Sequence, residues 1–233
     1  MSRCRPILFT GPMVCAVLQG RKTHTRRLVK PQPPDFWQTV EVGHYHPTII
    51  DRYGEQQPGA EVFGAYDLDG EWGCPSPYGE PGDLLWVRET WRTGVALDKH
   101  NATQIAESAD EAGYTKPWAP LLYNARPHGH EHASVNADTL GSFGGAWGRV
   151  RAARFMPRWA SRITLRVRSV RVERLHAMTE TDAVAEGFSD LNQSALTMFK
   201  FAWEDMHDVR WEDANPWVWD IGFERVDDDE VPF

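Results

Sequence analysis

Alternating hydrophobic and polar positions predict two long strands in the last third of the chain. Over residues 161–175 apolar side chains alternate with arginine and threonine, and the alternation changes phase near Ser169. Residues 217–223 alternate in the same way after an Asn-Pro turn. A change of phase is typical of a bulge or sharp bend, a feature that barrels need.

Shorter patterns predict helices and one further strand. Pro12 in a first turn, followed by an apolar run that ends before Gly20, indicates a short helix. Residues 84–91 have the alternation of a strand, and residues 178–186 have the pattern of a short helix. Ser194 is placed to cap a longer helix with apolar residues at helical spacing.

Two long stretches, at about 31–80 and 93–150, show no sustained periodicity. We expect the first to be irregular, with a short hairpin at most. Irregular stretches of this length inside a compact domain are usually functional loops or lids. The whole pattern predicts one α+β domain over 1–226, a small half-open β-barrel with flanking helices and two long loop insertions, followed by an acidic flexible tail over 227–233.

Length and composition place the chain among ordinary globular proteins. It has 233 residues, of which 41% are hydrophobic and 25% charged, which excludes a wholly disordered chain. Three scattered cysteines are too few for a disulfide framework or a zinc knuckle. No apolar run approaches the roughly 18 residues of a membrane span. We expect a cytoplasmic protein with no membrane partner and no cofactor.

The charge distribution is uneven. The net charge of −8 argues against a protein that coats DNA non-specifically. Residues 149–174 nevertheless contain nine arginines and a single acid, Glu173. The planar arginine fork suits phosphate, so the stretch is either a solvated strand face or a nucleic-acid contact. The candidate nucleic-acid contacts are Arg158, Arg162, Arg166 and Arg168.

The basic turn after the first helix holds the first candidate chemistry. The Thr25 hydroxyl is a poor nucleophile until a base removes its proton, and Lys22 can be that base if its pKa is lowered. Burial or neighbouring cations lower a lysine pKa, and Arg21, Arg26 and Arg27 supply the cations. The same residues can equally form an ordinary helix terminus or a phosphate-binding turn.

Glu186 is the second candidate, at the end of the predicted helix over 178–186. On a solvent-facing side it would be an ordinary surface residue. Facing the Lys22 turn, it can hold the lysine or pass a proton to a leaving amine. Histidines at 128, 130 and 132 alternate as metal ligands can in an extended segment, but no fourth ligand is evident. We interpret them as a solvated loop and expect no metal.

Three sequence blocks together resemble one known family, the ASCH domain family, whose fold is a PUA-like β-barrel. These blocks are residues 20–27, 81–89 and 178–187. Three further segments, residues 9–13, 156–162 and 215–219, resemble the longer ASCH proteins that are common in bacteriophages and prophages. The resemblance covers about half of the chain. For a phage-encoded protein it implies the cytoplasm of a bacterial host.

The resemblance implies an activity and a set of site residues. Small bacterial members are metal-independent amidohydrolases that remove the acetyl group from 4-N-acetylcytidine. The positions that match their catalytic residues are Lys22, Thr25 and Glu186, and Arg27 matches a basic residue near the pocket. The implied substrate is an N4-acylated cytosine nucleoside or nucleotide. The chain departs from these enzymes in carrying Arg26 where they have an apolar residue, and in being more than twice as long.

The resemblance also leaves alternatives open. Other relatives bind RNA or resemble ribonucleases, so a non-catalytic module for RNA or modified DNA and a ribonuclease remain rival interpretations. Trp86 and Trp159 are candidates to stack on a base, and each is equally suited to the core of a barrel. The candidate substrate-binding residues are Arg21, Arg26, Arg27, Trp86, Arg88 and Trp159.

Overall fold

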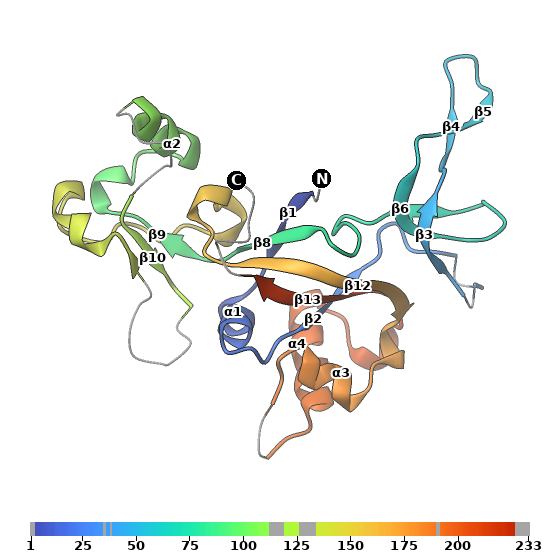
Figure 1. Ribbon diagram of the computed structural model, residues 1–233. Helices are drawn as coiled ribbons and strands as arrows, with labels where there is room; N and C mark the ends of the chain where they lie inside the picture. The colour runs from blue at the N-terminus through green and yellow to red at the C-terminus, as the bar shows by residue number, and fades with distance from the viewer. Residues whose placement is uncertain are drawn as a thin grey trace. The chain divides into compact units, whose positions relative to one another are not determined.

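The computed structural model of the protein describes residues 3–34, 36–37, 39–111, 119–125, 134–189 and 192–226. This part of the chain is mixed α+β, with most of its regular structure in strands (Figure 1). The predicted α+β class is therefore confirmed. The acidic tail 227–233 and the histidines at 128, 130 and 132 lie outside the described residues. Within the described ranges, no helix has the length and apolar character that crossing a bilayer requires.

The largest sheet has five strands in the order β1-β8-β12-β13-β2. These strands are β1 (Cys4–Leu8), β8 (Leu84–Arg88), β12 (Thr164–Arg174), β13 (Trp217–Val226) and β2 (His24–Leu28). The antiparallel register of β13 with β2 places Asp220 opposite Arg26 and Ile221 opposite Thr25. Strands β1 and β2 are the two edges of this order, so the pairing among the described strands does not close a barrel.

The chain divides into two compact units, and each is described by itself. Unit 1 comprises Met1–Arg5, Arg21–Leu84 and Arg166–Glu224. Unit 2 comprises Pro6–Gly20, Leu85–Leu165 and Arg225–Phe233.

Unit 1 contains regular structure where the sequence predicts an irregular insertion. The stretch 31–80 holds a three-stranded sheet in the order β3-β6-β7 and a two-stranded hairpin of β4 and β5. The strands are β3 (Glu41–Tyr45), β4 (Thr48–Ile50), β5 (Gln56–Pro58), β6 (Val62–Tyr66) and β7 (Gly73–Pro75). The prediction of a long loop at 31–80 is therefore wrong.

The helical part of unit 1 follows the sequence signals closely. Its elements are η5 (Leu175–Ala177), α3 (Glu180–Ala185), α4 (Ala195–His207) and η6 (Trp211–Asp213). Thr179 and Asp182 form a reciprocal capping box at the start of α3, and the Ser194 hydroxyl accepts from Thr197 N at the start of α4. Phe199 and Trp203 of α4 are buried against Val218 of β13 and the ends of α3. This packing fixes the C-terminal end of α3, where Glu186 lies.

Unit 2 also contains regular structure inside the second predicted insertion. Its elements are α1 (Gly11–Leu18), β9 (Trp91–Arg92), η1 (Val95–Leu97), α2 (Ala102–Glu111), β10 (Leu121–Tyr123), β11 (Ser134–Val135), η2 (Ala137–Phe143), η3 (Ala153–Phe155) and η4 (Arg158–Ala160). Strands β11, β10 and β9 form a three-stranded sheet. Its core gathers around Trp91, Ile105, Tyr123 and Met156. The expectation that 93–150 is loop throughout is therefore also wrong.

Candidate functional site

Lys22 and Glu186 form a buried ion pair in unit 1. The Lys22 ammonium contacts Glu186 Oε2 and donates to two carbonyl oxygens, those of Glu186 and His24, each at 2.9 Å. The two side chains are 0% and 2% exposed. All three donors of the ammonium therefore have acceptors, and the two segments that the sequence analysis expects to meet are in direct contact.

The turn around Lys22 also covers the C-terminal end of α3. Thr23 N donates to the Ala185 carbonyl at 2.8 Å, and Arg21 Nη1 donates to the Gly187 carbonyl at 2.6 Å. Gly187 has a φ of +96°, the left-handed conformation that commonly ends a helix. Cations beside the last carbonyls of a helix are favourable because they complement its dipole. Arg21 and Lys22 thus have a structural role whatever chemistry they carry.

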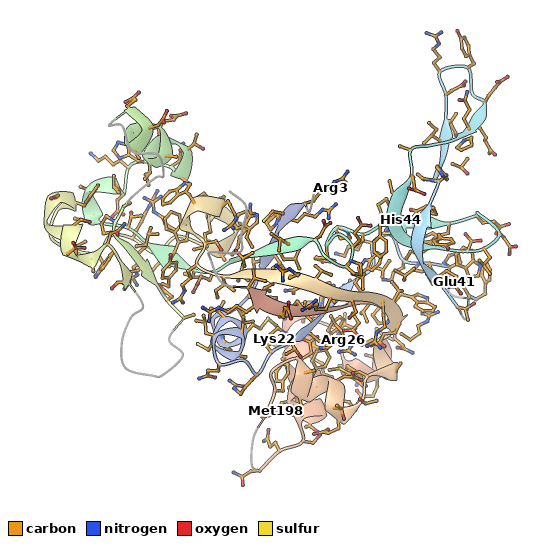
Figure 2. The ribbon with its side chains drawn as sticks, in the orientation of Figure 1. Arg3, Lys22, Arg26, Glu41, His44 and Met198 are labelled. Carbon is orange, nitrogen blue, oxygen red and sulfur yellow. The ribbon has the colours of Figure 1, made fainter. Side chains whose placement is uncertain are left out.

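Arg26, labelled with Lys22 in Figure 2, connects this pair to a wider charge network. Its backbone N–H donates to Glu186 Oε1 at 2.5 Å, and its Nε and Nη2 both donate to Glu173 Oε1. Its Nη2 also lies 3.5 Å from a carboxylate oxygen of Asp182. The network is completed by Asp220, which forms an ion pair with Arg171.

Two polar atoms in the network have no hydrogen-bond partner among the described residues. They are Arg26 Nη1 and Asp220 Oδ1, which lie 3.8 Å apart. Arg26 Nη1 is also 3.9 Å from Glu186 Oε1. These separations exceed a direct hydrogen bond, but a single hydroxyl or water oxygen can bridge groups at such distances. The network thus presents a donor and an acceptor beside the Lys22–Glu186 pair.

The electrostatics of the network favour the neutral form of Lys22. Burial lowers the pKa of Lys22, the Glu186 carboxylate opposes that effect, and the Arg27 and Arg26 charges lower the pKa further. The pKa of Arg26 is raised: burial acts against the charge, but Asp220 and Glu173 outweigh it. Arg26 is therefore a fixed cation, while Lys22 is the group in the pair that releases a proton more readily than an ordinary lysine.

Thr25 and Arg27 lie on the opposite face of β2 from Arg26, because successive strand residues alternate. Thr25 is buried and pairs with Ile221 of β13. The Lys22 ammonium donates to the Glu186 carboxylate and to the carbonyls of Glu186 and His24. Arg27 pairs with Trp219, and its charge acts on Lys22. The structure thus brings Lys22, Glu186 and Arg26 together, and the catalytic role of Thr25 stays a prediction.

Three predicted substrate-binding residues belong to unit 2 and have packing partners there. The Arg88 guanidinium lies 4.6 Å from the ring centroid of Trp86, which is buried in β8. Trp159 packs edge-on against Trp91, with ring centroids 5.8 Å apart. These contacts fit the core interpretation of both tryptophans. Their contact with a substrate remains a prediction.

Four of the nine arginines in the stretch 149–174 form ion pairs with carboxylates from distant parts of the sequence. In unit 2, Arg162 donates through Nε and Nη2 to both oxygens of the buried Glu89. In unit 1, Arg168 and Arg166 both pair with Glu224, at 2.5 and 3.5 Å. Arg158 in unit 2 donates to the hydroxyl of Thr164. The excess of arginines in the sequence therefore overstates the positive charge that is available to bind a phosphate.

Sequence reasoning missed Asp220, Glu173, Asp182 and Arg171 as members of the charge network around Arg26. Asp220 carries a readable signal, because it interrupts a run that is apolar at nearly every position from Trp217 to Phe223. Such a strand is buried on both faces, and a buried carboxylate requires a cation. The register of β13 with β2 supplies that cation as Arg26.

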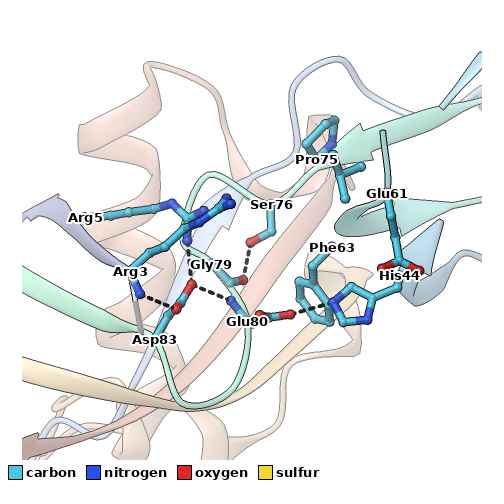
Figure 3. Close-up of a pocket in the computed structure, with 11 residues that line it drawn as sticks. Arg3, Arg5, His44, Glu61, Phe63, Pro75, Ser76, Gly79, Glu80 and Asp83 are labelled. Carbon is cyan, nitrogen blue, oxygen red and sulfur yellow. Dashed lines mark hydrogen bonds and ion pairs between the residues drawn. The ribbon is translucent and has the colours of Figure 1, made fainter. Parts of the chain in front are cut away.

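A polar cavity of about 340 Å³ forms a second feature of unit 1 (Figure 3). Asp83 lies at one side of it and accepts from Arg5 Nη1 and from the backbone N–H of Arg3, both at 2.7 Å. Across the cavity, His44 Nε2 lies 2.6 Å from Glu80 Oε2. Both signs of charge line this cavity and most of them are paired, so it has no clear preference for an anion or a cation.

Neither the comparison with family models, nor that with curated proteins, nor that with solved structures yields a significant match to this chain. Among the described residues, no group of three or more His, Cys, Asp and Glu side chains is arranged to hold a metal ion. The functional argument therefore depends on the geometry of the Lys22–Glu186–Arg26 network and on the sequence resemblance.

Proposed function

We propose that unit 1 is an amidohydrolase that removes an acyl group from the exocyclic amine of an N4-acylated cytosine nucleoside or nucleotide. The observation that carries the proposal is the buried contact of Lys22 with Glu186, in surroundings that lower the pKa of the lysine. A lysine with a lowered pKa can act as a general base. The proposal includes the finer fold, a PUA-like barrel of the ASCH type found in bacteriophages.

The proposed reaction begins with proton removal by neutral Lys22. The proton comes from the Thr25 hydroxyl or from a water that Thr25 positions, and the resulting oxygen attacks the acyl carbon. As the C–N bond breaks, the Lys22 ammonium returns the proton to the leaving cytosine amine. Glu186 holds the lysine in place through both steps. The products are the free amine and the carboxylic acid, directly or after hydrolysis of a Thr25 ester.

Arg26 gives the proposed site a feature that the small enzymes of the family lack. Its Nη1, which has no hydrogen-bond partner among the described residues, lies beside Glu186, and the guanidinium is held by Glu173 and the charge of Asp220. A fixed cation of this kind can stabilise the oxyanion of a tetrahedral intermediate, an effect typically worth about 3 kcal/mol per donor. Because Lys22 and Glu186 are almost fully buried, substrate must enter through local opening between the Lys22 turn and the end of α3.

The test is hydrolysis of 4-N-acetylcytidine, followed by the absorbance change as cytidine forms. Loss of turnover is expected for Lys22→Ala, Thr25→Ala and Glu186→Gln, while Lys99→Ala at an exposed lysine of unit 2 serves as the matched control. Circular dichroism of each variant separates loss of chemistry from loss of fold. Turnover that survives all three changes, or no turnover by the folded wild-type protein on acylated cytidine or cytidylate, would contradict the proposal.

The rival interpretation as a nucleic-acid-binding module receives less support from the geometry. Of its four candidate arginines, Arg162 is committed to a buried carboxylate, and Arg166 and Arg168 share Glu224. Binding through many phosphates weakens steeply with salt. An RNA or DNA oligomer whose affinity falls steeply with salt, and falls again in Arg168→Gln, would revive that interpretation.

A further inference from the structure

A cavity in unit 2 lies where helix α2 begins, beside the bridge between Trp91 and Arg151. Its volume is about 490 Å³, within the range of small-molecule sites. Trp91 and Arg151 exchange backbone hydrogen bonds of 3.2 and 2.8 Å. The Arg151 guanidinium then donates to the carbonyls of Leu97 and His100, at 2.7 and 2.9 Å. These bonds hold the turn that leads into α2 against the cavity wall.

The wall of this cavity carries buried donors that lack acceptors. Trp91 is fully buried, and Nε1, the only polar atom of its side chain, has no hydrogen-bond partner among the described residues. Arg151 is 8% exposed, and its Nε also has no hydrogen-bond partner among the described residues. A buried donor without an acceptor is costly, by about 1–3 kcal/mol for each group. Both residues line the cavity, so a ligand with acceptor atoms can relieve that cost.

The start of α2 adds further donors to the same cavity. Asn101 and Gln104 form a reciprocal cap, each side-chain oxygen accepting from the other residue's backbone N–H at 2.9 Å. The next two N–H groups, of Ala102 and Thr103, have no acceptor within the helix, and both residues line the cavity. The first turn of a helix favours an anion through these N–H groups and through the helix dipole.

Charge and shape select an anion that carries a flat apolar group. None of the described residues that line the cavity is acidic, and exposed Arg149 contributes a cation. Burial lowers the pKa of Arg151, and the charge of Arg149 lowers it further, while the carboxylate of Asp98, which accepts from Arg149 N, partly offsets both effects. An anion bound between Arg149 and Arg151 would relieve the repulsion between these two cations. Phe155, which is 62% exposed, provides an aromatic surface on the same cavity.

We infer that this cavity is a nucleotide site that holds the phosphate of a nucleoside monophosphate at the start of α2, between Arg149, Trp91 Nε1 and Arg151, with the base on Phe155. Phosphate offers three acceptor oxygens to a wall that carries several donors and no acidic side chain, and an aromatic base stacks on an aromatic side chain. The inference does not rest on the proposed hydrolysis, because none of its residues belongs to the Lys22 network.

The test is isothermal titration calorimetry of the whole chain with adenosine 5′-monophosphate, adenosine and inorganic phosphate. Adenosine monophosphate is expected to bind at least 10-fold more tightly than either of the others. Arg149→Gln and Trp91→Phe should each weaken it by about 10-fold. Ala102→Pro should weaken it less, because proline removes one N–H yet is well tolerated at the first helical position.

Arg52→Gln, an exposed arginine of unit 1, is the matched control and should leave the affinity unchanged. If Trp91→Phe does not fold, Arg149→Gln and Ala102→Pro still test the site. The inference is overturned if adenosine monophosphate does not bind, if adenosine or inorganic phosphate binds as tightly, or if Arg149→Gln leaves the affinity unchanged. Hydrolysis of acetylcytidine is measured separately, so failure of one proposal does not decide the other.

Discussion

Replacing Lys22 by methionine removes one charge from the buried network and keeps nearly the same side-chain length. In the wild-type protein the ammonium satisfies Glu186 Oε2 and the carbonyls of Glu186 and His24. Methionine satisfies none of these acceptors. Glu186 keeps the N–H of Arg26 at 2.5 Å and the Arg26 guanidinium at 3.9 Å. The variant therefore leaves a buried carboxylate with one direct donor instead of two.

Removing one partner of a buried ion pair costs about 3–5 kcal/mol. The donor that remains on Glu186 places the expected loss for Lys22→Met at the low end, about 3 kcal/mol. A domain has a free energy of unfolding of about 5–15 kcal/mol, so the variant should fold with clearly reduced stability. Glu186→Gln in the same background removes the uncompensated charge. The double variant should therefore cost less than the two single variants added together, with a coupling of about 1–3 kcal/mol.

The assay is urea-induced unfolding of the wild-type protein, both single variants and the double variant. The free energy of unfolding should fall while the dependence on urea stays unchanged. Lys99→Met, at an exposed lysine, is the control and should stay within about 0.5 kcal/mol of wild type. A loss below about 1 kcal/mol for Lys22→Met, or strictly additive variants, would refute the description of the pair as buried and coupled.

Three further outcomes are expected. The hydrolysis rate should rise with pH as Lys22 loses its proton. Since the Arg27 charge lowers the pKa of Lys22, Arg27→Gln should shift the inflection of the pH–rate profile to higher pH. Arg162→Met leaves the Glu89 carboxyl, whose pKa burial already raises, without its cation. Urea unfolding should show a loss of about 3–5 kcal/mol at pH 7 and a smaller loss at pH 4, where more of the Glu89 carboxyl is protonated. Gly79→Ala should lower the free energy of unfolding by about 1–3 kcal/mol, because Gly79 has a φ of +83°.

Each of these outcomes has a control in the same unit. Arg210→Gln removes an exposed arginine of unit 1 and should not move the inflection that Arg27→Gln raises. Arg154→Met in unit 2 should show no larger loss at pH 7 than at pH 4. Gly70 has a similar φ, +76°, but open space around its Cβ position, whereas a Cβ on Gly79 meets Asp83 and Arg5. Gly70→Ala should therefore cost less, and equal losses would contradict the steric argument.

The long strands could be predicted because their pattern is local. Strand β12 alternates over much of its length and β13 is apolar at nearly every position from Trp217 to Phe223, so each signal accumulates along the chain. The strands between 31 and 80 have no such pattern: β4 and β5 are three residues long and fully exposed. Their pairing is stabilised by backbone hydrogen bonds, which do not depend on the pattern of hydrophobic side chains in the sequence. This is why the stretch was predicted to be irregular.

The charge network shows where sequence reasoning stops. The contact of Lys22 with Glu186 was expected from a resemblance, since 164 positions separate the two residues in the sequence. The charge of the arginine stretch, when it is summed over neighbours in the sequence, leaves out carboxylates that lie elsewhere in the chain. Glu89 and Glu224, which form ion pairs with three of its arginines, lie outside the stretch. Pairing between charges is a property of the fold, and no local pattern reports it.

The Lys22–Glu186 pair admits both a structural and a catalytic interpretation, and the pH dependence of activity distinguishes them. Burial lowers the pKa of any lysine, so a lowered pKa is compatible with both interpretations. Here burial and the charges of Arg27 and Arg26 lower the pKa of Lys22 despite Glu186. The network thus weakens the proton affinity of the group that it holds in place, as general-base catalysis requires. Arg27→Gln changes that proton affinity while leaving every contact of the ammonium intact, so a shifted pH profile with unchanged stability would identify Lys22 as the base.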